Sequence, residues 1–106
     1  REVAGKRALR GRVSIADVLR AVEQVKGERW ACFKDRYGDA GAALAMWAAR
    51  RFTGLTLKEI GEALGGVDYA AVSVAIRRLE VRTRDNEAVA AQQQALIRLL
   101  KVEMSP

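Results

Sequence analysis

The clearest alternation of apolar and polar positions lies between Thr53 and Glu80. Leu57, Ile60 and Leu64 are spaced i, i+3 and i+7, as on one apolar face of a helix. A pair of glycines at 65–66 interrupts the pattern, and a second apolar face follows. The pattern therefore predicts two short helices joined by a tight turn. The second face consists of Val72, Ala75, Ile76 and Leu79.

Residues that favour helix ends flank both faces. Thr56 and Glu59 have the spacing of a capping box, in which each side chain accepts a hydrogen bond from the other residue's backbone N–H. Asp68 is a natural N-cap for the second helix. Gly54 can take the left-handed conformation found just past helix ends, and Gly61 lets a neighbour approach closely. These signals predict a helix-turn-helix, which sets its second helix into the DNA major groove.

The opposite side of the second helix carries small residues followed by a cation. Ala70, Ser73 and Val74 would let the backbone approach a groove, while Arg77 could reach a phosphate or a guanine edge. We therefore interpret about residues 68–82 as a candidate recognition helix. An ordinary helical hairpin inside an unrelated all-α domain has the same spacing and is the alternative.

Upstream, the pattern predicts a helix and a short helical turn. Ser14 begins the helix, with Asp17 three residues on as a shorter substitute for the Glu of a capping box, and Gly27 ends the helix. Residues 28–33 form the short turn, with Trp30 and Phe33 pointing inward. The apolar face of the first helix is Ile15, Val18, Leu19, Val22 and Val25.

A basic loop at 34–38 follows, and then another helix that Asp39 is expected to cap and that runs to about Phe52. Arg50 and Arg51 lie near the C-terminus of this helix. Cations there suit the helix dipole, so structure alone explains them, although they are also candidates for DNA phosphates. The buried side is expected at Ala43, Leu44, Trp47, Ala48 and Phe52.

The last predicted helix begins at Asp85, after the candidate recognition helix ends near Arg82 or Thr83. We expect it to pack back on the domain, which predicts a monomer, with a dimer contact as the alternative. A single proline and few β-branched runs argue against a sheet. The prediction is one all-α domain over residues 13–106, a compact bundle of about five to six helices. The apolar side of the last helix is expected at Ala88, Ala91, Ala95, Leu96, Leu99, Leu100 and Met104.

The net charge is +6, and the excess of cations lies near the start of the chain. Residues 1–38 hold ten Lys or Arg against five Asp or Glu, whereas residues 39–106 hold nine against eight. A basic segment is the expected footprint of a nucleic-acid-binding protein. Residues 1–12 are therefore either a basic N-terminal arm or the end of a linker. The chain opens on Arg1 rather than Met, so we expect a fragment or a trimmed chain.

Several activities lack the residues that they need. Cys32 is the single cysteine and there is no histidine to activate it, so we expect a small buried side chain in a reducing cytoplasm. No GxxxxGK[ST] phosphate loop and no spacing of metal ligands occurs. We therefore expect no enzymatic activity, cofactor, metal or small-molecule substrate. No apolar stretch approaches the roughly 18 residues of a membrane span. No leader resembles a signal peptide either, so we expect the bacterial cytoplasm, near the nucleoid.

A family likeness is carried by short motifs in the second half of the chain. They are Ala48-x-Arg50-Arg51-Phe52-Thr53, Leu57-Lys58-Glu59-Ile60-Gly61, Gly65-Gly66-x-Asp68, and Val72 with Ala75-Ile76-Arg77-Arg78. With them, the segment from about Ile15 to Arg82 resembles the C-terminal DNA-binding domain of the bacterial chromosomal replication initiator family, DnaA. That family has a Trp-repressor-like helical fold, and it shares the turn between Ile60 and Val72, which is one residue longer than in common repressors.

Part of this region is also similar to the initiator-like domain attached to transposases associated with repetitive extragenic palindromes. Those transposases have a separate catalytic domain with a histidine pair and a tyrosine, and this chain has no histidine. The resemblance therefore implies a separate catalytic domain or partner protein. The motifs are Leu55-Thr56-Leu57-Lys58-Glu59-Ile60-Gly61, Tyr69, Ala71-Val72-Ser73 and Arg77-Arg78.

The initiator resemblance implies roles for individual residues. In that family the start of the recognition helix reads bases, which points to Asp68 and the residues after it. Tyr69, Ala70 and Ala71 stand where the family usually has His and Thr or Ser, so the family's target sequence is not implied.

The family's basic loop enters the minor groove, which points to Lys34 and Arg36. Lys58 matches a family position near the first motif helix and is a candidate phosphate contact. Further phosphate candidates are Arg50, Arg51, Arg77 and Arg78, and Ser73 and Val74 complete the groove-facing set.

Two functions from different classes follow. The first is sequence-specific binding of double-stranded DNA, which the arginines and the basic loop favour. The second is a protein-interaction module that keeps the helical fold without reading bases. Ala70, Ala71 and Val74 favour the second, because their side chains supply no hydrogen bonds. Cations lying on one surface with the helix start at Asp68 would favour DNA.

Overall fold

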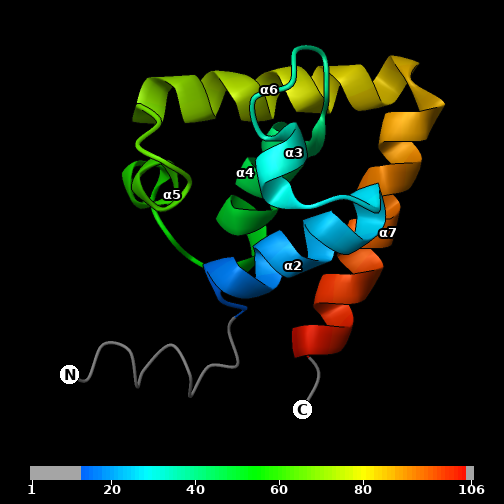
Figure 1. Cartoon of the computed structure of the whole chain (residues 1–106), viewed down its shortest axis with the longest axis horizontal. Helices are drawn as coiled ribbons and strands as arrows, with labels where there is room; N and C mark the ends of the chain where they lie inside the picture. Colours follow the sequence, from blue (N-terminus) through cyan, green and yellow to red (C-terminus); the bar gives the residue numbers. More distant parts are fainter. Residues whose placement is uncertain (1–12, 105–106) are drawn as a thin grey trace.

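The computed structural model describes residues 13–104. The predicted basic arm at 1–12 and the side chain of Met104 lie outside the described residues. Within that range the chain forms six α-helices and no strand, which confirms the all-α prediction (Figure 1). The helices are α2 (Ile15–Lys26), α3 (Trp30–Phe33), α4 (Gly41–Phe52), α5 (Leu57–Ala63), α6 (Tyr69–Asp85) and α7 (Glu87–Met104).

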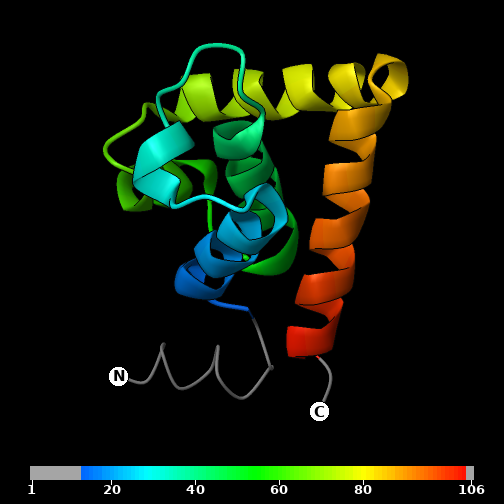
Figure 2. The same ribbon diagram turned by 45° about the vertical axis from the view of Figure 1, so that its right-hand side comes forward.

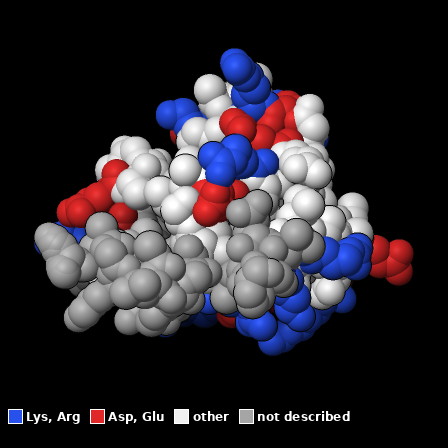
Figure 3. All heavy atoms as spheres, turned by 90° about the horizontal axis from the view of Figure 1, so that it is seen from below, with Lys and Arg blue, Asp and Glu red and all other residues white. Residues whose placement is uncertain are grey.

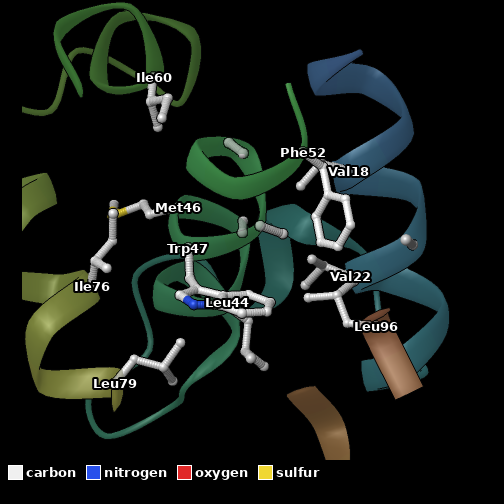
Figure 4. Packing of buried hydrophobic residues seen from close by; sticks show 14 of the residues in the cluster. Val18, Val22, Leu44, Met46, Trp47, Phe52, Ile60, Ile76, Leu79 and Leu96 are labelled. Carbon is white, nitrogen blue, oxygen red and sulfur yellow. The ribbon is translucent and has the colours of Figure 1, made fainter. Parts of the chain in front are cut away.

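Helix α4 forms the centre of the bundle. Its alanines leave room for close neighbours, and it packs against α2, α3, α5, α6 and α7. Met46 points toward Ile76 on one side, whereas Phe52 lies beside Val18 on the other (Figure 4). Because α4 is buried on almost every side and contacts helices on both sides, it fixes the position of α5 and α6 relative to α2. The buried residues of α4 are Gly41, Leu44, Ala45, Met46, Trp47, Ala48, Ala49 and Phe52.

The predicted helix ends are confirmed where capping side chains define them. The Ser14 hydroxyl accepts a hydrogen bond from the Asp17 N–H at 3.1 Å, and the Asp17 carboxylate accepts one from the Ser14 N–H, also at 3.1 Å. Gly27 ends α2 in the left-handed conformation with φ 71°. A cap of this kind contributes about 1 kcal/mol to helix stability, so the capping residues help to determine where α2 begins.

The last helix packs back on the domain as predicted, against α2, α4 and α6. Its start was predicted one residue too early, and its buried face was predicted in part, because Leu96 and Leu100 are buried as expected and Leu99 packs against the core. Helix α6 continues through Asp85, and the Asn86 side chain caps α7 by accepting a hydrogen bond from the Val89 N–H at 3.1 Å. Ala88 and Ala91 are exposed. Larger side chains bury more apolar surface than alanine, and the stripe of Val89, Leu96 and Leu100 decides which face turns inward.

The predicted helical turn after α2 is shorter than expected, because α3 begins at Trp30. Phe33 is fully buried and Trp30 is half-buried, with the two rings edge to face at 5.6 Å. Cys32 is exposed, which corrects the expectation of a buried thiol. A single helical turn offers one side to the core, and Phe33 occupies that side.

Helix α6 lies along one edge of the molecule, and α7 turns away from its end and runs back along α2 (Figures 1 and 2). Within the described range, no helix is both long enough and apolar enough to cross a membrane. The outward side of α6 exposes Val74 and Val81.

Candidate nucleic-acid interface

Helices α5 and α6 are joined by a turn that depends on its glycines. Gly65 and Gly66 have φ angles of 109° and 84°, a backbone conformation that side chains with a Cβ rarely adopt. The N–H groups of Gly66 and Val67 both donate to the Gly61 carbonyl oxygen at 2.9 Å. A Cβ built on Gly61 would lie 1.9 Å from the Val67 carbonyl oxygen. The turn therefore packs directly on the α5 backbone, as the close approach predicted at Gly61 requires.

The capping residues of both helices are in place. The Thr56 hydroxyl accepts from the Glu59 N–H at 3.1 Å, and the Glu59 carboxylate accepts from the Thr56 N–H at 2.8 Å. The Asp68 carboxylate accepts from the Ala70 N–H at 3.0 Å, so Asp68 is the N-cap of α6. Because this carboxylate caps its own helix, its role in the first turn is structural.

The first turn of α6 exposes the residues predicted to face a groove. Tyr69 is 60% exposed, and Ala70 and Ala71 are exposed beside it. The methyl groups of the alanines can contact only apolar groups such as a thymine methyl, whereas the tyrosine hydroxyl can form hydrogen bonds. One turn further on, Val74 is exposed and Ser73 is half-buried. Tyr69 is therefore the main hydrogen-bonding side chain at the start of α6.

Two arginines from different helices border one hollow beside α6. Arg50, at the end of α4, and Arg77, on α6, line it together with Leu57 at the start of α5 and with Ser73, Ile76 and Glu80 of α6. Arg77 also borders a second hollow on the outward side of α6, which Arg78 shares. Arg50 and Arg77 are both exposed. The fold thus places these predicted phosphate contacts next to the α5–α6 unit.

Arg51 and Lys58, the other two predicted phosphate contacts near α5, have different surroundings. The Arg51 guanidinium lies over the Trp47 and Phe52 rings, 5.6 Å and 5.8 Å from their centroids. It lines neither of the two hollows beside α6. Lys58 is exposed in the first turn of α5. Arg51 therefore packs on aromatic rings of its own helix, and Lys58 extends into solvent.

The loop at 34–40 holds one of its two predicted DNA contacts in ion pairs. Arg36 Nη2 donates to a Glu28 carboxylate oxygen at 2.6 Å, and its Nη1 donates to the other Glu28 oxygen at 3.1 Å and to Asp39 at 3.0 Å. The Cys32 carbonyl oxygen also accepts from Nη2, at 3.2 Å. Lys34 is exposed, with its amino group 4.0 Å from Asp35. Lys34 therefore faces solvent, whereas Arg36 is bound to its own protein.

Asp39 joins this network to the body of the domain. Its carboxylate accepts from Lys26 Nζ at 2.8 Å and from the Gly41 N–H at 2.7 Å, and its side chain is 5% exposed. The predicted cap is thus corrected in detail, because Ala40 is the N-cap residue of α4 and Asp39 reaches the helix from one residue earlier. Burial alone would raise the pKa of Asp39, but the hydrogen bonds from Lys26 and Gly41 lower it below its ordinary value.

The ion pairs also shift the pKa values at the far end of the network. The hydrogen bond from Arg36 lowers the pKa of Glu28. The same hydrogen bond raises the pKa of the Arg36 guanidinium. Both groups are therefore charged over the whole neutral range, and the ion pair joins the loop to Glu28, just after the end of α2.

The loop also contacts α6 directly. Arg82 Nη2 donates to the Gly38 carbonyl oxygen at 2.9 Å, which ties the loop to the second half of α6 (Figures 1 and 2). Tyr37, the residue before this anchor, is 102% exposed. Neither Tyr37 nor Arg82 was among the predicted site residues. The alternation of cations and carboxylates from Lys34 to Asp39 was the signal that could have indicated a closed loop.

Charge on the surface is mixed. On the visible part of the face in Figure 3, small groups of Lys and Arg lie beside groups of Asp and Glu. That face lies on the side of the molecule away from α6 (Figure 1). No group of three or more His, Cys, Asp or Glu among the described residues could hold a metal ion.

Comparison with known proteins finds similarity to a bacterial replication initiator. Over 94 residues the chain is 31% identical to the chromosomal replication initiator protein DnaA of Caulobacter vibrioides strain NA1000/CB15N. It matches the DnaA of strain ATCC 19089 to the same extent. The match covers 85% of this chain and 19% of each initiator, so the chain spans about a fifth of the length of these curated relatives. No family model matches the chain, and no solved structure matches it.

Proposed function

We propose that this chain binds double-stranded DNA in a sequence-specific way, with α5 and α6 acting as a helix-turn-helix. The observation that carries the proposal is the first turn of α6. It is capped by Asp68 and exposes Tyr69 with two alanines, and Arg50 and Arg77 border a hollow along the following turns of α6. An exposed helix start of small residues with cations at its sides fits a major groove, because the backbone approaches the bases while guanidinium groups reach phosphates.

Base recognition would then depend on few side chains. Each good base contact contributes about 1–3 kcal/mol of discrimination, and Tyr69 is the main hydrogen-bonding candidate in the first turn. Arg50, Arg77 and Arg78 would contact phosphates, with Lys58 as a further cation. Affinity should therefore fall steeply with salt, and the choice of sequence should depend on the start of α6 together with the shape of the DNA.

The similarity to DnaA supports a place within a larger protein. We propose that the chain is the DNA-binding part of a replication-initiator-like protein, or an initiator-like domain attached to a transposase. Any catalytic step would then belong to a separate domain or partner, and this chain would act as a monomer without cofactor or catalysis in the bacterial cytoplasm. DnaA is named for chromosomal replication initiation, which makes replication the first process to test.

The test is a fluorescence-anisotropy titration with random duplex DNA and with duplexes selected from a randomised pool, across a salt series. The proposal predicts that selected duplexes bind at least about a hundredfold more tightly, within the range of specific over non-specific binding. Tyr69→Ala should reduce this ratio, and Arg77→Ala should weaken both kinds of duplex equally. Arg98→Ala on α7 is the matched control, since Arg98 is exposed beside the hollow between α2 and α7.

A protein-interaction module is the second candidate. Val74 is 37% exposed and Val81 is 50% exposed on the outward side of α6, where they give an apolar stripe bordered by arginines. Such a stripe suits a protein partner better than a groove lined with phosphates. Equal and weak binding to all duplexes would favour this candidate over base recognition.

A further inference from the structure

The charged side chains of the loop at 34–40 bind one another and their neighbours in the fold. Arg36 uses both terminal nitrogens within the protein, on Glu28, Asp39 and the Cys32 carbonyl oxygen. Asp39 is in turn bound to Lys26, whose side chain is 11% exposed. A guanidinium engaged in this way can contact DNA only by giving up several charge-assisted hydrogen bonds. Arg36 is therefore placed to shape the loop.

The side chain that the loop presents is Tyr37. Its neighbour Arg36 is held by the ion pairs, and its other neighbour, Gly38, is held through its carbonyl oxygen by Arg82. Gly38 has φ 80°, which makes the sharp bend after the tyrosine. Tyr37 itself is 102% exposed. An aromatic ring held out between two anchored residues loses little backbone freedom when it binds, so it is well suited to recognition.

The position of the loop relative to α6 suits contact with the same duplex. The loop rises beside α6 and reaches its outward side in both views (Figures 1 and 2). From Tyr69 to Arg82, which bonds the loop, the helix extends roughly 20 Å at about 1.5 Å per residue. A duplex whose axis ran along α6, with its major groove at Tyr69, would bring a minor groove near the loop, because half a turn of B-DNA is roughly 17 Å.

We propose that Tyr37 is the DNA contact of this loop and that Arg36 is a positioning residue. The inference rests on the proposed DNA binding and deepens it. The tyrosine ring would pack on deoxyribose at the edge of the minor groove, and its hydroxyl would donate to a phosphate oxygen. Glu28 and Arg36 then act as one unit, because each is needed to hold the loop that presents the ring.

The test uses the anisotropy titration with a selected duplex and three variants of the full chain. Tyr37→Ala should weaken binding about tenfold, the scale of losing one aromatic contact with a nucleic acid, with an unchanged melting temperature. Arg36→Gln and Glu28→Gln should each weaken binding, and the double variant should be no weaker than either alone. Arg20→Gln on α2 is the control, since Arg20 is paired with Asp17 away from the loop.

Glu28→Gln separates the two roles for Arg36 by the sign of its effect. If Arg36 contacted DNA, removing the carboxylate would release the guanidinium and reduce repulsion, and binding would tighten. The salt slope gives the same separation. Arg36→Gln should leave it unchanged, whereas losing a phosphate contact lowers it by about one.

Failure of this inference differs from failure of DNA binding as a whole. Wild-type protein that binds every duplex equally and weakly would contradict the proposed function. Specific binding by the wild type with an unaffected Tyr37→Ala variant would overturn this inference alone, and so would tighter binding by Glu28→Gln. Tyr37→Ala still decides the question if either ion-pair variant fails to fold, because Tyr37 is wholly exposed.

Discussion

The α5–α6 unit and the loop at 34–40 were both predicted to contact DNA, but they are built in different ways. The α5–α6 unit is shaped by its backbone and by capping side chains, so Tyr69 and Arg77 remain at the surface. The loop is shaped by ion pairs, and the Arg36 guanidinium is bound in two of them, to Glu28 and to Asp39. A cation in a sequence is therefore not the same as a cation available to DNA. What matters is whether a carboxylate lies within reach in the folded chain.

The largest expected effect on stability is in the α5–α6 unit, which is shaped by its backbone. In Gly61→Ala the new Cβ would lie 1.9 Å from the Val67 carbonyl oxygen, so the turn before α6 must move. We expect a loss of about 3 kcal/mol in the free energy of unfolding, at the upper end for overpacking, measured by urea denaturation. Gly65→Ala is the control, because a Cβ there meets nothing within 4 Å and only the φ of 109° is unfavourable. A loss no greater than in this control would contradict the close packing.

The next largest effect on stability is expected in the loop at 34–40, which is shaped by ion pairs. Asp39→Asn removes the carboxylate from Lys26 and Arg36 and leaves the Lys26 ammonium, 11% exposed, without that partner. We expect a loss of about 2 kcal/mol in the free energy of unfolding, which is below the usual cost of breaking a fully buried pair. Thermal unfolding followed by circular dichroism measures it. Asp35→Asn, at an exposed carboxylate 4.0 Å from Lys34, should have almost no effect.

The same contrast predicts how stability depends on pH. The lowered pKa values of Glu28 and Asp39 stabilise the folded state above their ordinary values of about 4. This stability is lost as the pH falls through the lowered values, when the carboxylates become protonated. The free energy of unfolding should therefore fall below about pH 4 and fall less steeply in Asp39→Asn. Parallel pH profiles for the two proteins would show that the ion pairs do not stabilise the loop.

The smallest effect separates the neighbouring arginines of α4. Arg50→Ala should lower the salt slope of DNA binding by about one, because Arg50 borders the hollow shared with Arg77. Arg51→Ala should leave the slope unchanged and cost about 0.5–1 kcal/mol of stability, the scale of a cation–π contact at an exposed site. Equal changes in slope would mean that both arginines reach phosphates.

The sequence was informative where structure depends on neighbours in the chain. The capping boxes at Ser14 and Thr56 and the close approach at Gly61 are local signals, and the structure contains each of them. Contacts between residues far apart in the sequence could not be predicted from it. The hydrogen bond from Arg82 to Gly38 joins residues far apart in sequence, and the burial of α7 on Val89 depends on which face meets α2. The pairing of Arg36 with Glu28 could not be predicted for the same reason, since the two residues lie on either side of α3.

The most direct measurement is an NMR titration of the labelled chain with a selected duplex, which shows where the DNA binds. The account predicts the largest backbone shifts over residues 68–78 and a second set at 36–38, with little change along the outward side of α7. Shifts confined to α2 and α7, or to residues 1–12, would contradict it. In that case α6 would not be the DNA-reading surface.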